Sequence, residues 1–145
     1  MIYLAAPLFN DMEKQRNEAL DAALRNSGFR TFLPQRDGGE FANESAPEAD
    51  PAQIRTQIFT ADIRAVKACE ILLFLFDGRV PDEGACFELG MAYALGKRCV
   101  GLKTDARSFI DGHDNIMLSE SLEAIFHDTG TLIAHLKNTT EKAGI

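Results

Sequence analysis

The chain has 145 residues, 46% of them hydrophobic and 26% charged, which is typical of one globular domain. Its 15 Lys and Arg against 22 Asp and Glu give a formal net charge of −7, a sign that disfavours a nucleic-acid polymer as partner. No apolar run approaches the roughly 18 residues of a membrane span, and the three cysteines have neither disulfide nor metal-site spacing. We therefore expect a single cytoplasmic domain over residues 1–145 that uses no metal and no cofactor.

Residues 2–6 form a short apolar run before Pro7, which predicts a first strand buried on both faces. Asn10, followed three residues later by an acid, has the spacing of a capping box and predicts the start of a helix. This helix is expected to end at Gly28, and a second strand is expected over residues 29–33.

The segment 36–50 holds five acids and several turn formers and shows no periodicity, so it predicts a long active-site loop. Asp50 and Pro51 form an N-cap and first-turn pair that predicts a helix to about residue 69. The most hydrophobic run, residues 71–76, predicts the central strand of a parallel sheet.

The rest of the chain repeats this alternation of helices and strands. Expected in order are a loop at 77–84, a helix from 84 or 85 to 95, a strand at 98–102, an irregular stretch at 103–117, a strand at 124–127, a helix capped by Asp128 and a polar tail at 138–145. This order predicts an α/β fold, with a doubly wound, five-stranded parallel sheet and right-handed crossovers.

In an open parallel sheet, ligands bind beyond the carboxyl ends of the strands. The segments predicted at those ends contain no Ser-His-Asp arrangement, and the three histidines lack the spacing of metal ligands. Hydrolysis by a serine triad and zinc chemistry are therefore not expected.

The segment from Gly84 to Leu95 is apolar on nearly every side and carries one charge, Glu88. A helix of this composition is expected to be buried, so its single carboxylate needs a reason. We expect the helix dipole to keep Glu88 ionised in a dry cleft, with Asp82 and Asp62 close by. Carboxyl groups that share a cleft push their pKa values apart, which separates a nucleophile from an acid. The alternative is that Glu88 complements the helix terminus and Asp82 caps it, without catalysis.

Three stretches together resemble the nucleoside 2-deoxyribosyltransferase family. They are IYLAAPLFN at the start, Asp62 on a helix before an apolar strand, and DGRVPDEGACFELGMAYALGK. The diagnostic elements are an Asp six residues before a Glu-Leu-Gly sequence, a Tyr in the first strand and an Asn-x-Met after the fourth. The resemblance implies a flavodoxin-like fold and exchange of the base of 2′-deoxynucleosides with free purine or pyrimidine bases through a covalent intermediate.

The resemblance also implies roles for individual residues. Glu88 matches the nucleophile that attacks C1′ of the sugar, Tyr3 matches the residue that orients it, and Asp82 matches the acid that protonates the leaving base. Asp62 matches an acid near the sugar hydroxyls. The substrate-binding residues expected beside them are Pro7, Phe9, Gln35, Asp37, Gly84, Asn115 and Met117. Of these, Asn115 and Met117 match a segment that reaches into a neighbouring subunit's site, so a homo-oligomer is expected.

Two other functions remain open at this point. One is a hydrolase of the same superfamily that removes the base from 2′-deoxynucleoside 5′-monophosphates, although the charge of Asp82 would repel a phosphate. The other is a nucleotide-sensing module that binds without reacting. Such a module would have no need of Glu88 and Asp82 together, and both are present.

Overall fold

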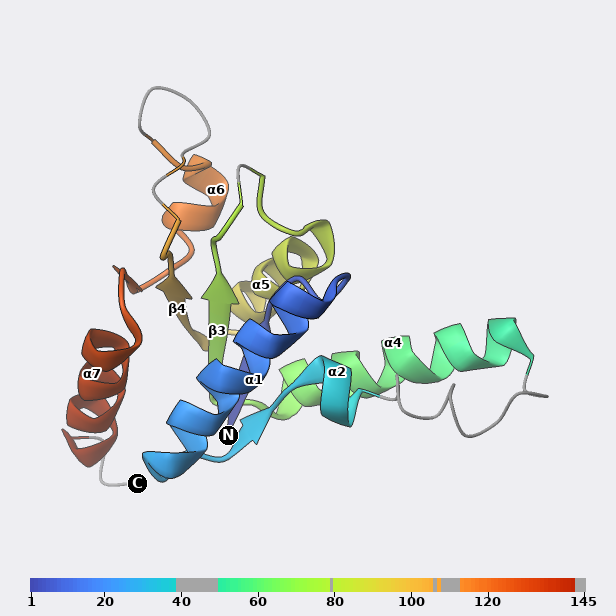
Figure 1. Cartoon of the computed structure of the whole chain (residues 1–145), viewed down its shortest axis with the longest axis horizontal. Helices are drawn as coiled ribbons and strands as arrows, with labels where there is room; N and C mark the ends of the chain where they lie inside the picture. Colours follow the sequence, from blue (N-terminus) through green and yellow to red (C-terminus); the bar gives the residue numbers. More distant parts are fainter. Residues whose placement is uncertain (39–49, 79, 106, 108–112, 143–145) are drawn as a thin grey trace.

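Five short strands form an all-parallel sheet in the order β2-β1-β3-β4-β5 (Figure 1). This computed structural model describes residues 1–38, 50–78, 80–105, 107 and 113–142. The elements are β1 (Ile2–Ala5), α1 (Asp11–Asn26), β2 (Thr31–Phe32), α2 (Pro34–Asp37), α4 (Pro51–Ala68), β3 (Ile71–Leu75), α5 (Glu83–Ala94), β4 (Arg98–Leu102), α6 (Ile116–Ser119), β5 (Ala124–Phe126) and α7 (Thr129–Lys142). The prediction of a doubly wound five-stranded parallel sheet is confirmed.

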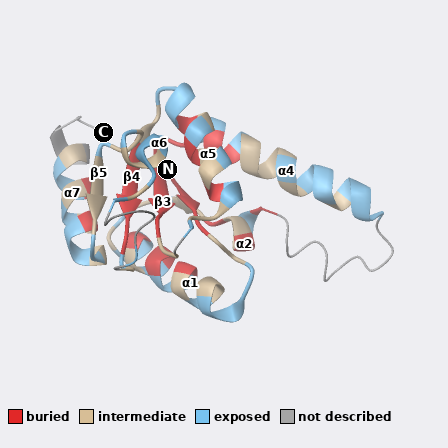
Figure 2. Ribbon diagram, turned by 90° about the horizontal axis from the view of Figure 1, so that it is seen from above, coloured by how far each residue is buried: buried red, intermediate tan, exposed pale blue. Residues whose placement is uncertain are grey.

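Helices cover both faces of the sheet, and each face has its own apolar cluster. Leu20 and Leu24 of α1 and Leu132 of α7 pack on one face, while Val66 of α4 and Leu89 of α5 pack on the other. The strand order reverses between β1 and β3, which places the ligand-binding crevice of this fold class beyond the carboxyl ends of those two strands. The first half of α4 extends beyond the body of the molecule, where its residues are largely exposed (Figures 1 and 2).

The helix boundaries follow the local chemistry of the sequence. Asn10 caps α1 by accepting a hydrogen bond from the backbone N–H of Glu13 at 3.0 Å, and Asp50 caps α4 in the same way. Gly28 and Gly96 follow the ends of α1 and α5 with φ values of 95° and 69°, a left-handed conformation that suits glycine. The predicted helix starts and stops at these positions are confirmed.

Three boundaries differ from those predicted. The second strand is limited to Thr31–Phe32, because the backbone N–H of Phe29 closes the end of α1 on Leu24 and α2 begins at Pro34. The predicted loop at 36–50 begins in α2, and its residues 39–49 lie outside the described part of the chain. The predicted polar tail is helical as far as Lys142, where α7 ends.

Within the described residues, no helix is both long and apolar enough to cross a membrane. The same residues contain no group of three or more His, Cys, Asp or Glu side chains arranged to hold a metal ion.

Candidate active site

A short hydrogen bond joins the first strand to α5 at the centre of the candidate site. Tyr3 is the second residue of β1, lies in register with Leu72 of β3 and Phe32 of β2, and is completely buried. Its ring stacks on that of Phe32, with centroids 5.4 Å apart and planes 10° apart. Its hydroxyl donates to Oε1 of Glu88 at 2.6 Å. The sheet therefore fixes the position of one carboxylate oxygen.

Glu88 lies in the second turn of α5, because the helix begins at Glu83 and not at residue 84 or 85 as predicted. The helix dipole acts mainly on the first turn, so it is weak at this position. Burial of the carboxyl group raises the pKa of Glu88 to about 8, the Tyr3 hydroxyl opposes this rise, and the charges of Asp62 and Asp82 add to it. Burial thus raises the pKa of Glu88, contrary to the expectation that this carboxylate is kept ionised.

Asp62 comes from α4 and lies near Glu88 and Tyr3, since its charge raises the pKa of both. Burial also raises the pKa of Asp62 itself, to about 6. Its Oδ1 atom is buried and accepts no hydrogen bond from any residue that the structure describes. A buried carboxylate oxygen without a donor is unusual in folded proteins, and a bound ligand is one way to satisfy it.

Asp82 is the N-cap of α5, and its Oδ2 atom accepts a hydrogen bond from the backbone N–H of Ala85 at 2.8 Å. The capping role that the sequence left open is therefore real. The charge of Asp82 also raises the pKa of Glu88, so the same side chain lies near the catalytic candidate. Its Oδ1 atom has no hydrogen bond within the described chain, which leaves one oxygen for a ligand. Glu88, Tyr3, Asp62 and Asp82 thus meet at one place.

The residues expected to bind substrate after the first strand lie on the turn that follows β1, and Gly84 lies in the first turn of α5. The carbonyl of Pro7 accepts a hydrogen bond from Asn17 at 2.8 Å, which fixes the turn after β1. Phe9 is 77% exposed on that turn. Gly84 is exposed in the first turn of α5, where an added Cβ would lie 3.1 Å from Oδ2 of Asp82. A side chain at Gly84 would crowd this oxygen.

Gln35 and Asp37, which the sequence placed opposite the base, have other partners. Gln35 is buried, accepts a hydrogen bond from Asn17 at 3.0 Å and donates to the carbonyl of Lys14 at 3.0 Å. Asp37 accepts from the backbone N–H of Leu33 at 2.9 Å. Both side chains are engaged within the fold, so the structure gives no support to direct contact with a base.

Asn115 precedes α6 as its N-cap and Met117 lies within α6, which packs beside α5 (Figure 1). Oδ1 of Asn115 caps α6 by accepting from the backbone N–H of Met117 at 2.9 Å. The side chain of Met117 is 78% exposed and that of Ile116 is 70% exposed. In the single chain, α6 therefore presents two apolar side chains to solvent.

The outer side of α5 is also apolar and exposed, contrary to the expectation that this helix is buried all round. Phe87 is 57% exposed and Tyr93 is 60% exposed. A groove of about 500 Å³ runs between α5 and α6 and is lined by Cys86, Leu89, Gly90, Tyr93, Ile116, Met117, Leu118, Glu120 and Ser121. The sequence of α5 thus suits complete burial, but the single chain buries only one side of it.

Sequence reasoning missed two residues at this site. Phe32 supports the ring of Tyr3, but a strand predicted over five residues gave no reason to single it out. Gly38 is buried, and a Cβ added to it would lie 2.7 Å from Oδ1 of Asp62. In the sequence Gly38 stands in a pair of glycines within a polar segment, which indicates only a turn.

Comparison with known proteins agrees with the resemblance seen in the sequence. Residues 2–141 match the family described as nucleoside 2-deoxyribosyltransferase. The chain belongs to this family. A nucleoside deoxyribosyltransferase from Limosilactobacillus fermentum is 26% identical over 127 residues, which are 83% of this chain and 75% of that protein. The resemblance inferred from the sequence is therefore confirmed, and this member has the α/β fold of its family.

Two solved structures extend the comparison. The 2-deoxyribosyltransferase from Bacillus psychrosaccharolyticus superposes with a TM-score of 0.74 at 27% identity, covering 91% of this chain and 89% of that one. A CMP N-glycosidase from Clostridium botulinum superposes with a TM-score of 0.57 at 19% identity, covering 95% and 98%, and so shares the fold. The family is enzymatic and acts on nucleosides and nucleobases.

Proposed function

We propose that this chain is a nucleoside 2-deoxyribosyltransferase that exchanges the base of 2′-deoxynucleosides by double displacement. The observation that carries the proposal is the 2.6 Å hydrogen bond from Tyr3 to Glu88, within a group that also contains Asp62 and Asp82. Transfer with two displacements at an anomeric carbon requires a carboxylate nucleophile on one side and an acid at the leaving group.

In the first displacement, Oε2 of Glu88, the oxygen that Tyr3 does not hold, attacks C1′ as the bond from C1′ to the base breaks. Asp82 gives its proton to the leaving base, whose nitrogen keeps the bonding electrons. The positive charge that develops at C1′ is stabilised by the surrounding carboxylates. In the second displacement, a new base attacks C1′, its proton returns to Asp82, and Glu88 leaves as the carboxylate.

The raised pKa of Glu88 is compatible with this role. Burial holds much of the carboxyl group of Glu88 in its protonated form at neutral pH. A carboxylate formed there is poorly solvated, and the Tyr3 hydroxyl is the donor that stabilises it. Activity is therefore expected to rise with pH toward 8.

Hydrolysis of nucleoside 5′-monophosphates is the second candidate function, and the charges of the site disfavour it. At the carboxyl ends of the strands, Lys103 pairs with Asp114 at 2.5 Å, and Arg16 pairs with Asp77. Arg107 pairs with Asp105 on the loop after β4. These described cations are already neutralised, so an incoming phosphate would meet the carboxylates of the site instead.

A second copy of the chain is proposed to complete the site. The exposed apolar side of α5 and the groove beside α6 are contiguous with the helix that carries Glu88. Burial of Phe87, Tyr93 and Met117 against a partner would remove apolar surface from water at about 25 cal/mol per Å². Asn115 and Met117 of one subunit would then lie at the edge of the other subunit's site.

The test is incubation with 2′-deoxyinosine and free adenine, followed by chromatography. Transfer predicts 2′-deoxyadenosine and hypoxanthine, and Glu88→Ala should abolish both. Release of free deoxyribose alone, or turnover only of a 5′-monophosphate donor, would identify a hydrolase. Absence of turnover on every nucleoside and nucleotide offered would favour the binding module.

The covalent step has its own test. Mass spectrometry of the protein mixed with donor nucleoside, without an acceptor base, should find one added deoxyribosyl group on the peptide that contains Glu88. An unmodified peptide under conditions in which transfer proceeds would contradict double displacement.

A further inference from the structure

Polar contacts from two of its side chains hold the short helix α2 against α1. Gln35 is buried against α1, where it bonds to Asn17 and to the carbonyl of Lys14. Arg36 pairs with the buried carboxylate of Asp21, which also belongs to α1. A one-turn helix has little stability of its own, so these contacts determine where α2 lies.

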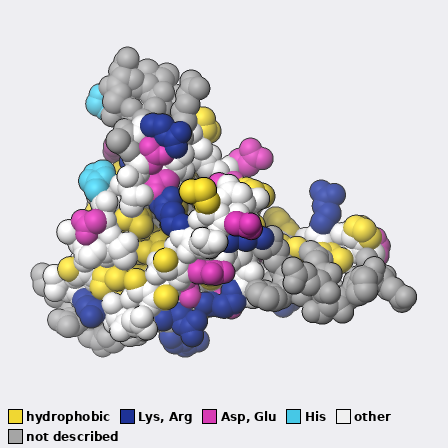
Figure 3. Space-filling model, viewed as in Figure 1, with side chains coloured by type: hydrophobic (Ala, Val, Ile, Leu, Met, Phe, Trp, Pro, Cys, Tyr) yellow, Lys and Arg dark blue, Asp and Glu magenta, His cyan; other side chains and the backbone are white. Residues whose placement is uncertain are grey.

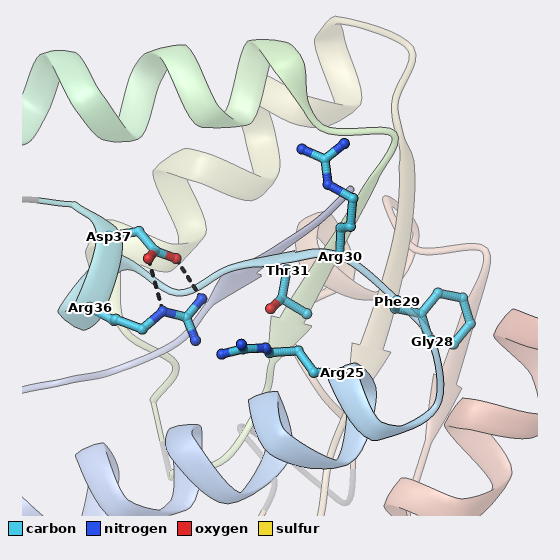
Figure 4. Close-up of a pocket in the computed structure, with 7 residues that line it drawn as sticks. All are labelled: Arg25, Gly28, Phe29, Arg30, Thr31, Arg36 and Asp37. Atoms are coloured by element: carbon cyan, nitrogen blue, oxygen red, sulfur yellow. Dashed lines mark hydrogen bonds and ion pairs between the residues drawn. The ribbon is translucent and has the colours of Figure 1, made fainter.

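Arg36 and Asp37 form a two-pronged pair within the helix, with nitrogen-to-oxygen distances of 2.8 and 2.7 Å (Figure 4). Asp21 also accepts a hydrogen bond from the hydroxyl of Thr31 at 2.5 Å and lies 3.6 Å from Arg25. The buried carboxylate thus joins α1, β2 and α2. Charge-assisted and bidentate bonds of this kind are the more rigid ones in proteins.

These contacts also explain the basic surface near the end of α1 and the start of β2. Lys and Arg side chains gather there at the lower edge of the molecule in Figure 3. Arg25, Arg30 and Arg36 line a pocket of about 440 Å³. Arg36 is paired with Asp21 of α1 and with Asp37, so its charge holds α2 against α1. Arg25 pairs with the same Asp21 within α1. We read this surface as an anchor for α2.

The other end of α2 meets the candidate site at Gly38. This residue has a φ of −82°, which any amino acid adopts, so its backbone conformation does not require glycine. The space around it does, because a Cβ would lie 2.6 Å from the carbonyl oxygen of Pro34 and 2.7 Å from Oδ1 of Asp62. Real Cβ atoms essentially never come that close to another heavy atom.

We propose that α2 is a clamp that positions Asp62 for base exchange, with Gly38 as the positioning residue in contact with it. The oxygen that faces Gly38 is the buried Oδ1 that no described residue satisfies, so its location decides which substrate group it receives. This inference rests on the proposed function, because it assigns Gly38 a part in the same reaction.

The test is Gly38→Ala, which adds one methyl group against Asp62 and against the carbonyl oxygen of Pro34. We expect kcat/KM for base transfer to fall about 10- to 100-fold, because catalytic groups tolerate displacements of less than about 1 Å. The matched control is Gly130→Ala on α7, which lies outside the site and is expected to keep the activity of the unchanged chain. Thermal unfolding of both variants checks that each is folded.

A double-mutant cycle with Asp62→Ala separates positioning from general damage. If Gly38→Ala acts through Asp62, adding it to Asp62→Ala should lower kcat/KM by less than about 2-fold. The pH profile of Gly38→Ala should also shift, since the charge of Asp62 is one cause of the raised pKa of Glu88. Equal losses in both backgrounds, or full activity of folded Gly38→Ala, would overturn the clamp. Failure of the proposed function is recognised separately, because the unchanged chain would then form no 2′-deoxyadenosine from 2′-deoxyinosine and adenine.

Discussion

Replacement of Glu88 by Gln is expected to stabilise the protein, and the gain should grow with pH. Burial, the largest cause, raises the pKa of Glu88 in the folded chain from 4.5 to about 8. In the unfolded chain this proton leaves near pH 4.5, so between pH 4.5 and 8 the folded state binds more protons. The contribution of Glu88 to the free energy of unfolding therefore falls as the pH rises. Glutamine does not titrate, and its Oε1 atom still accepts from Tyr3.

The size of the stability gain follows from the distance between pH 7 and the pKa of Glu88 in the unfolded chain. Each unit of difference in pKa corresponds to about 1.4 kcal/mol, and pH 7 lies about 2.5 pH units above the value for the unfolded chain. Glu88→Gln should therefore be about 3 kcal/mol more stable than the unchanged chain at pH 7 and nearly equal to it at pH 4.5. For a chain of this size the difference in Tm at pH 7 is about 6–12 °C.

The assay is thermal and urea unfolding of both proteins between pH 4.5 and 8.5, at one fixed protein concentration. Glu83→Gln is the control, because it removes an exposed carboxylate from the first turn of the same helix. Its effect should stay within about 0.5 kcal/mol across the range. A stability difference between Glu88→Gln and the unchanged chain that does not vary with pH would refute the argument that burial dominates at Glu88.

Three further predictions address the site and its surroundings. Tyr3→Phe should move the rise of activity to higher pH and lower kcat/KM about 10- to 100-fold, because the lost hydrogen bond normally lowers the pKa of Glu88; an unchanged pH profile would count against it. Asp62→Asn should move the same rise to lower pH, since it removes a charge that raises the pKa of Glu88, and a steady-state pH series of kcat/KM distinguishes the two directions. Tyr93→Asp should dissociate the proposed oligomer and reduce activity with it, which sedimentation and transfer assays at matched concentrations would show; an active monomer would remove the proposed role of the partner subunit.

Much of the fold is predictable from the sequence, because its signals are local. The apolar runs around β1 and β3 and the caps at Asn10 and Asp50 need no knowledge of distant residues. The second strand is shorter than predicted, because no local signal sets its length. Its length depends on how α1 ends and α2 begins, and at Phe29 a backbone bond to α1 replaces the strand ladder. The hydrophobicity of residues 29–33 does not reveal this competition between a bond to α1 and a bond within the sheet.

In the candidate site, too, the features with local sequence signals are predictable and those that depend on distant contacts are not. The sequence pattern predicts Glu88, Asp62 and Asp82, the family resemblance adds Tyr3, and the structure brings the four together. The ionisation of Glu88 was not predictable, since it depends on how much water the packed fold excludes. The role of Gly38 was equally hidden, because it depends on a contact with α4, whose residue Asp62 is distant in the chain.

Burial links the stability of this protein to its chemistry. The packing of α5 against the sheet removes Glu88 from water and makes its charge unfavourable, while Tyr3 supplies one hydrogen bond in return. Such a carboxylate is more reactive toward a developing positive charge at C1′ than a solvated one, because less water must be displaced before it acts. The rest of the site then has to hold its acids at fixed distances, since each added negative charge raises the pKa of Glu88 further. This requirement gives a physical reason for the polar anchor of α2. A short helix fixed by Asp21 and Gln35 keeps Gly38 against Asp62, and so keeps one of those charges in its place.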